Sequence, residues 1–109
     1  MSNEKKGILI KTLFDVTASE ADRDDCAIYL ADFDDEETIQ ALFNAANDFN
    51  VSDMIRGSCG ESLAEIWLRK QQIDFNLLLL LKGTALTEVL NLIKKDKLEW
   101  YERYMRGTK

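Results

Sequence analysis

Apolar residues recur along most of the chain at spacings of three and four, which is the period of an α-helix that buries one face. Short polar segments interrupt this pattern. The alternation of apolar and polar residues that is typical of a strand never persists for more than a few residues. The pattern therefore predicts an all-α protein. The expected helices cover about residues 6–16, 19–31, 36–48, 53–70, 75–82, 84–95 and 98–106.

Residues with short polar side chains stand where several of these helices should begin. Ser19 and Asp74 are suitable N-caps, because a side-chain oxygen there can accept a hydrogen bond from a backbone N–H of the first turn. Ser52 or Asp53 fills the same role for the helix over residues 53–70. These caps support the helix boundaries that the apolar pattern gives.

Five consecutive leucines occupy residues 77–81. They leave the short helix over residues 75–82 little polar face, so we expect it to be buried on most sides. The run is too short to cross a bilayer. Gly83 is expected to end this helix and Thr84 to cap the next one.

A weak internal repeat of about 33 residues runs through the first two thirds of the chain. Such a period indicates stacked helical units, which form extended binding surfaces and seldom carry catalytic groups. The repeated positions are Arg23, Cys26, Leu30 and Ala31, followed 33 residues later by Arg56, Cys59, Leu63 and Ala64. Gly57 and Gly60 lie within the second unit, where each costs about 1 kcal/mol relative to alanine. We expect a neighbouring helix to pack closely over them.

The repeated unit resembles the HEAT-like repeats, which stack pairs of antiparallel helices into a curved solenoid. The resemblance rests on residues 34–46 (DDEETIQALFNAA) and 55–66 (IRGSCGESLAEI), and it extends over about residues 19–95. It implies a short solenoid of about six or seven antiparallel helices in one domain over residues 1–109. The usual turn proline is absent and Gly60 replaces a typical alanine, so an irregular helical bundle is the alternative fold.

The residue types argue against catalysis. The chain has no histidine, no glycine-rich phosphate loop and no nucleophile motif, so we expect no enzyme, no cofactor and no metal site. The acidic segment at residues 32–37 lacks the turn glycine of a calcium loop. Cys26 and Cys59 are expected to be free, buried thiols. Without a signal peptide or membrane-spanning segment, the predicted location is the cytoplasm, with no membrane partner.

Charge is distributed unevenly along the sequence. Residues 15–65 contain fourteen acidic and two basic residues, which gives −12, whereas residues 94–109 contain six basic and three acidic residues, which gives +3. The acidic half should repel nucleic acid and attract a basic protein. The alternative interpretation is an acidic face that only contributes to solubility.

The predicted partner-binding surface combines carboxylates near helix ends with one aromatic anchor. The carboxylates are Asp22, Asp25, Asp32, Asp34, Asp35, Glu36, Asp53, Glu61 and Glu65. Phe33 is expected to be an exposed ring among them. Charge reversal at Asp34 and Asp35 should slow association with a basic partner. The aromatic C-terminal segment, with Trp100, Tyr101 and Tyr104, is expected to cap the core or to form a second contact site.

The small size, acidity and helical repeats resemble bacterial immunity proteins, some of which are built from HEAT-like repeats and neutralise nuclease toxins. The resemblance implies a non-enzymatic protein that binds a basic, nuclease-type toxin through its acidic surface. An adaptor or scaffold that binds through apolar anchors is the second hypothesis. A small lyase-like or modifying subunit is the third, and it requires a reactive thiol at Cys26 or Cys59.

Overall fold

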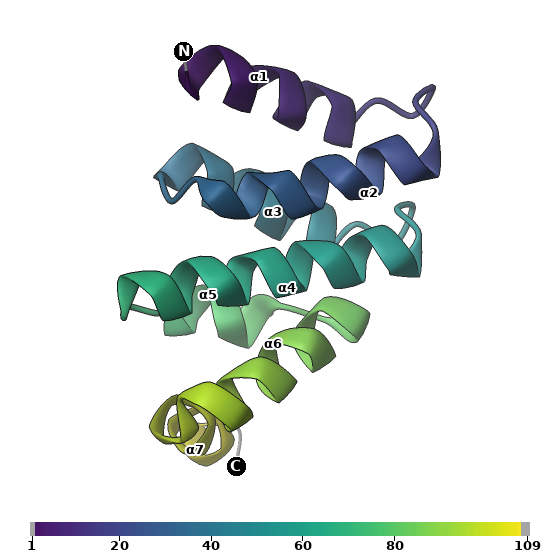
Figure 1. Cartoon of the computed structure of the whole chain (residues 1–109). Coiled ribbons are helices and arrows are strands. Elements are labelled where there is room, and N and C mark those ends of the chain that lie inside the picture. The colour runs from purple at the N-terminus through teal and green to yellow at the C-terminus, as the bar shows by residue number, and fades with distance from the viewer. Residues whose placement is uncertain (1, 108–109) are drawn as a thin grey trace.

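The computed structural model describes residues 2–107. This part of the chain contains seven α-helices, one 3-10 turn and no strand, which confirms the predicted all-α class (Figure 1). The helices are α1 (Ser2–Leu13), α2 (Glu20–Tyr29), α3 (Glu36–Ala46), α4 (Asp53–Lys70), α5 (Phe75–Leu80), α6 (Gly83–Asp96) and α7 (Leu98–Gly107), and the 3-10 turn η1 covers Leu30–Asp32.

The N-caps that the sequence predicts are present. Ser19 Oγ accepts a hydrogen bond from the backbone N–H three residues later at 3.0 Å, and Asp74 Oδ1 makes the equivalent bond at 3.1 Å. At α4 the cap is Ser52, whose Oγ accepts at 3.3 Å, and Asp53 is the first helical residue. Each cap satisfies one N–H that the helix itself leaves unpaired.

Helix α1 lies earlier in the chain than the apolar pattern predicts, at residues 2–13 instead of 6–16. Asp15 accepts hydrogen bonds from the backbone N–H and the hydroxyl of Thr17, at 2.9 and 2.6 Å. Side-chain bonds of this kind offer the backbone an alternative to the helix. The helix therefore ends before Asp15, although the apolar pattern continues through Phe14 and Val16.

The predictions for the leucine-rich helix were wrong. Leu79 and Leu80 are 51% and 57% exposed, because the six-residue helix α5 buries only one side. Gly83 does not end α5, and Thr84 is not a cap. Helix α5 ends at Leu80, and α6 begins at Gly83 with a φ of +62°, a conformation that glycine adopts without strain.

Helix α4 lies between α2 and α6 and packs against both (Figure 1). Residues at the end of α4 reach the segment that follows α2: Arg69 and Lys70 donate to backbone carbonyls there at 3.2 and 3.1 Å. Before α4, the Asn47 side-chain amide donates to the carbonyl of Leu80 and accepts from the N–H of Lys82, both at 3.0 Å. The three helices therefore run side by side in the same direction.

The two glycines of α4 face α6, as predicted. A Cβ atom added at Gly60 would lie 2.5 Å from the carbonyl oxygen of Ala85 and 2.8 Å from its Cα. One at Gly57 would lie 3.2 Å from the Cγ2 methyl of Thr84. The absence of a side chain at Gly60 lets the backbones of α4 and α6 approach, which offsets the low helix propensity of glycine.

Candidate functional site

The structure separates the predicted binding residues into several places. Asp32 to Asp35 lie in the connection between α2 and α3 and Glu36 is the first residue of α3, whereas Asp22 lies in the first turn of α2. At about 1.5 Å per residue, the length of α2 separates these groups. Asp53 lies at the start of α4, and Glu61 and Glu65 lie along its middle. The carboxylates do not line one edge.

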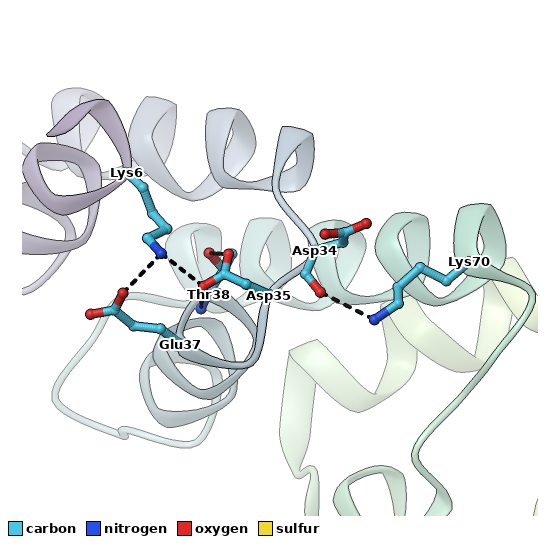
Figure 2. Close-up of polar contacts among 6 residues, drawn as sticks. All are labelled: Lys6, Asp34, Asp35, Glu37, Thr38 and Lys70. Carbon is cyan, nitrogen blue, oxygen red and sulfur yellow. Dashed lines mark hydrogen bonds and ion pairs between the residues drawn. The ribbon is translucent and has the colours of Figure 1, made fainter. Parts of the chain in front are cut away.

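The fold itself uses the charge of Asp35. Its carboxylate caps α3 and accepts from the hydroxyl of Thr38 at 2.7 Å. Figure 2 shows Lys6 reaching across from α1 to both Asp35, at 2.9 Å, and Glu37, at 3.0 Å. Partial burial opposes ionisation of Asp35, but the hydrogen bonds from Lys6 and Thr38 outweigh it and hold the pKa of this carboxyl below its ordinary value. The hydrogen bonds that Lys6 donates to Asp35 and then to Glu37 raise the pKa of Lys6.

The rest of this acidic turn is also tied to the fold through its backbone. The carbonyl of Asp34 accepts from Lys70 (Figure 2), and the carbonyl of Phe33 accepts from Arg69. The ring of Phe33 is partly buried against the core, so the prediction of an exposed aromatic anchor was wrong. The carboxylates of Asp32, Asp34 and Glu36 belong to exposed residues, and Glu36 accepts from Gln40 at 3.3 Å.

At the start of α4, Asp53 is paired with Arg56. The Arg56 guanidinium also lies over the ring of Phe49, 4.9 Å from its centroid. This pairing offsets the charge of Asp53. Asp22 and Asp25 are exposed on α2.

A group of carboxylates that crosses α2, α4 and α6 remains available. We call it the carboxylate row, and its members are Asp24, Glu61, Glu65 and Glu88. Within residues 2–107 no ion pair involves any of the four. Asp24 accepts from the buried hydroxyl of Ser58 on α4 at 2.6 Å, which holds α2 and α4 in register. Glu88 packs next to α4, because its Cγ lies 3.9 Å from the position of a Cβ on Gly57.

Electrostatics link the members of the carboxylate row. Desolvation raises the pKa of Glu61, and the negative charges of Glu88, Glu65 and Asp24 raise it further. A carboxyl whose pKa is raised by like charges lies in a negative potential, which attracts cationic groups. The row contains two predicted residues, Glu61 and Glu65. Asp24 and Glu88 were not among the predicted residues.

The internal repeat gives one indication that Asp24 lies near α4. It places α2 and α4 in equivalent successive units, which are expected to be neighbours. No comparable signal exists for Glu88, since its unit does not align with the repeat. In the part of the chain that is described, no group of three or more His, Cys, Asp or Glu side chains is arranged to hold a metal ion.

Both cysteines are free and buried, as predicted. Burial raises the pKa of the Cys59 thiol to about 12. Partial burial also raises the pKa of Cys26. Since the thiolate is the nucleophile, neither environment favours covalent catalysis.

The aromatic residues of α7 pack against the core. Trp100, Tyr101 and Tyr104 are partly buried there, as the capping interpretation predicts. Lys94 and Lys97 of the preceding segment lie over the rings of Tyr101 and Trp100, each 5.3 Å from the centroid. These contacts hold α7 against α6.

Among residues 2–107 no helix is both long enough and apolar enough to cross a membrane. Comparisons of the chain with protein families, with characterised proteins and with solved structures find no match. The residues and their geometry are therefore the basis for assigning a function.

Proposed function

We propose that this chain is a non-enzymatic binding protein that holds a basic protein on its carboxylate row. The single observation that carries the proposal is the contrast in pairing. Asp35 and Glu37 are both paired with Lys6, whereas the row has four carboxylates from three helices and no basic partner within the described residues. Complementary charge of this kind raises association rates and selects partners.

We propose further that the partner is a nuclease-type bacterial toxin, which the protein neutralises in the cytoplasm. A nuclease binds the phosphates of its substrate in a basic cleft. A row of carboxylates on a rigid helical face is complementary to such a cleft and competes with the substrate for it. The resemblance to small bacterial immunity proteins supports this choice of partner.

We also propose that the helices form a short HEAT-like solenoid of antiparallel pairs. The repeated positions support it, because Cys26, Leu30 and Ala31 are buried on α2 and η1 and their counterparts 33 residues later are buried on α4. The parallel course of α2, α4 and α6 is the arrangement expected of successive second helices. Their exposed side is then the binding surface.

The proposed binding surface differs from the set of partner-binding residues that the sequence predicts. Glu61 and Glu65 form its centre, with Asp24 and Glu88 beside them, and Asp25 continues it on α2. The exposed carboxylates of the α2–α3 connection remain secondary contacts, and Asp35 and Asp53 serve the fold.

The test compares two double variants of equal charge. Glu61→Lys with Glu65→Lys reverses the centre of the row, and Asp32→Lys with Asp34→Lys makes the same change in net charge at the acidic turn. The tagged proteins are used to capture partners from the native host at low salt, followed by a salt gradient and mass spectrometry. Nuclease activity of each captured protein is then measured with and without added wild-type protein.

We expect wild-type protein to capture one strongly basic nuclease, to release it only at high salt and to inhibit it at a one-to-one ratio. The row variant should lose capture, and the turn variant should keep most of it. Equal losses in both variants, or a captured protein without nuclease activity, contradict the proposal.

An adaptor or scaffold is the second candidate, and exposed apolar residues favour it. The connections before α2, α4 and α6 lie on the same side of the molecule (Figure 1). Val16 and Phe49 in these connections are 83% and 68% exposed, and Leu80 at the end of α5 is also exposed. Capture of several neutral proteins that resists salt and is abolished by Phe49→Ser supports the adaptor instead.

A further inference from the structure

A groove of about 600 Å³ lies between α3, the end of α4, α5 and α7. Its lining includes Trp67, Phe75 and Trp100, together with the cations Lys70 and Arg103. This volume is within the range of sites for small ligands, about 300–1,000 Å³. None of the four residues of the carboxylate row lines it, so the groove is a separate feature of the molecule.

The indole N–H of Trp67 is an unused hydrogen-bond donor in this groove. Trp67 is only 2% exposed, and its N–H has no acceptor among the described residues. Arg56 Nε is the one fully buried side-chain nitrogen or oxygen that lacks a partner within residues 2–107, so the unpartnered Trp67 nitrogen is not fully buried. Trp67 is one of the residues that line the groove. A nearly buried N–H in that position favours an incoming acceptor.

The charged side chains of the groove differ in the partners that they already have. Within the described residues, neither Arg103 nor Lys70 forms an ion pair with a carboxylate. Arg103 lies over the ring of Phe75, 4.1 Å from its centroid, and Lys70 donates to a backbone carbonyl. By contrast, the two carboxylates in the lining already accept hydrogen bonds, Glu36 from Gln40 and Asp74 from the N–H of Leu77.

The groove therefore offers the guanidinium of Arg103 without a carboxylate partner, the Trp67 N–H and aromatic rings, beside the side-chain amides of Gln72 and Asn76. We propose that the groove binds a carboxylate that is attached to an aromatic group. The carboxylate pairs with Arg103, an oxygen of the ligand accepts from the Trp67 N–H, and the ring of the ligand packs against Trp100 and Phe75. This chemistry is provided by the C-terminal aromatic residue of a peptide or by a free aromatic acid. The proposal is independent of the carboxylate row and of its basic partner.

The experiment follows the two indole N–H signals of ¹⁵N-labelled protein by NMR during titration with N-acetylphenylalanine. The chain has two tryptophans, so a Trp100→Phe variant assigns both signals. We expect the Trp67 signal to shift and to saturate with a dissociation constant of about 1 mM, which is typical of a ligand of this size. An unmoved Trp67 signal at concentrations well above this value overturns the proposal.

Two controls test the carboxylate. N-acetylphenylalaninamide has the same ring and acyl group without the charge and should bind about fivefold more weakly, as should N-acetylphenylalanine to Arg103→Gln. Arg106→Gln, which removes a cation from the same helix outside the groove, should leave affinity unchanged. Equal binding of the acid and the amide, or equal losses in both arginine variants, also overturns the proposal.

Phenylacetate separates the two sources of the ligand. If it binds as tightly as N-acetylphenylalanine, the acyl group contributes nothing and the groove is a site for free aromatic acids. If it binds more weakly while N-acetylphenylalanine shifts Trp67, the groove recognises the end of a peptide chain.

Discussion

The acidic turn between α2 and α3 and the carboxylate row use the same chemical group in opposite ways. The turn is the most acidic stretch of the sequence, but Asp35 caps a helix and pairs with Lys6, and Lys6 also pairs with Glu37. The row is dispersed over three helices, and within residues 2–107 no cation is paired with it. Charge density along a sequence therefore does not reveal how much charge is available to a partner.

The largest expected effect comes from disrupting the packing on which the row rests. Gly60→Ala places a Cβ atom 2.5 Å from the backbone oxygen of Ala85, so α6 must move away from α4 and carry Glu88 away from Glu61. We expect a loss of about 2–3 kcal/mol in the free energy of unfolding, measured by urea denaturation, because overpacking outweighs the better helix propensity of alanine.

Gly7→Ala is the matched control for this variant. No atom lies within 4 Å of an added Cβ at Gly7, so the same exchange should stabilise the protein by up to about 1 kcal/mol. If Gly60→Ala is as stable as the wild type, the close approach of α4 and α6 does not constrain the row.

A smaller effect is expected at the acidic turn. Asp35→Ala removes the cap of α3 and one of the two carboxylate partners of Lys6, and it should cost about 1–2 kcal/mol at neutral pH. Since the folded pKa of Asp35 is lowered, this contribution is complete above the ordinary carboxyl pKa and is lost as the pH falls through the folded value. Urea denaturation of both proteins at a series of pH values measures the difference.

Asp34→Ala tests whether a carboxylate in the acidic turn stabilises the protein only because of its position there. Its side chain is exposed and only its backbone carbonyl bonds to Lys70, so stability should change by less than about 0.5 kcal/mol. Equal costs at the two positions contradict the distinction between Asp35 and its neighbours.

The smallest effect on the free energy of unfolding is expected in the carboxylate row, where the substitution should stabilise the protein. Glu61→Gln removes a negative charge whose ionisation the folded state disfavours, so the variant should be a few tenths of a kcal/mol more stable at neutral pH. Because the folded pKa is raised, this advantage is complete above the folded pKa and disappears as the pH falls below the ordinary value of 4.5.

Glu102→Gln makes the same chemical change at an exposed position of α7, away from the row, and should leave the free energy of unfolding at neutral pH unchanged. A destabilised Glu61→Gln variant at neutral pH shows that the row carboxylates are not in mutual repulsion. In that case the carboxylate row does not differ from the acidic turn, whose carboxylates stabilise the fold.

The sequence predicts the helices well where a local signal marks their ends. Helix α4 has the predicted bounds, because Ser52 caps it and the apolar period is unbroken. The end of α1 was missed because the turn at Asp15 interrupts a helix whose apolar pattern continues. The exposure of Leu79 was missed because the burial of α5 depends on its neighbours and not on its own composition.

The row could not be predicted as a unit. Glu61 and Glu65 are one helical turn apart and were identified together, but Asp24 and Glu88 join them only through the register between helices. That register depends on contacts such as the hydrogen bond from Ser58 to Asp24 and the approach of Ala85 to Gly60. A single sequence contains these residues without indicating that they meet.

The side-chain hydrogen bonds that join one helix to the next connect residues with a limited separation in the sequence. In the described chain they span at most 36 residues, from Arg69 and Lys70 back to the segment after α2. Contacts between successive units lose less loop entropy when they form than contacts between the two ends of the chain would. During synthesis, α1 to α4 have all their mutual contacts available before α6 is made, so the molecule is able to assemble from its N-terminus as it leaves the ribosome.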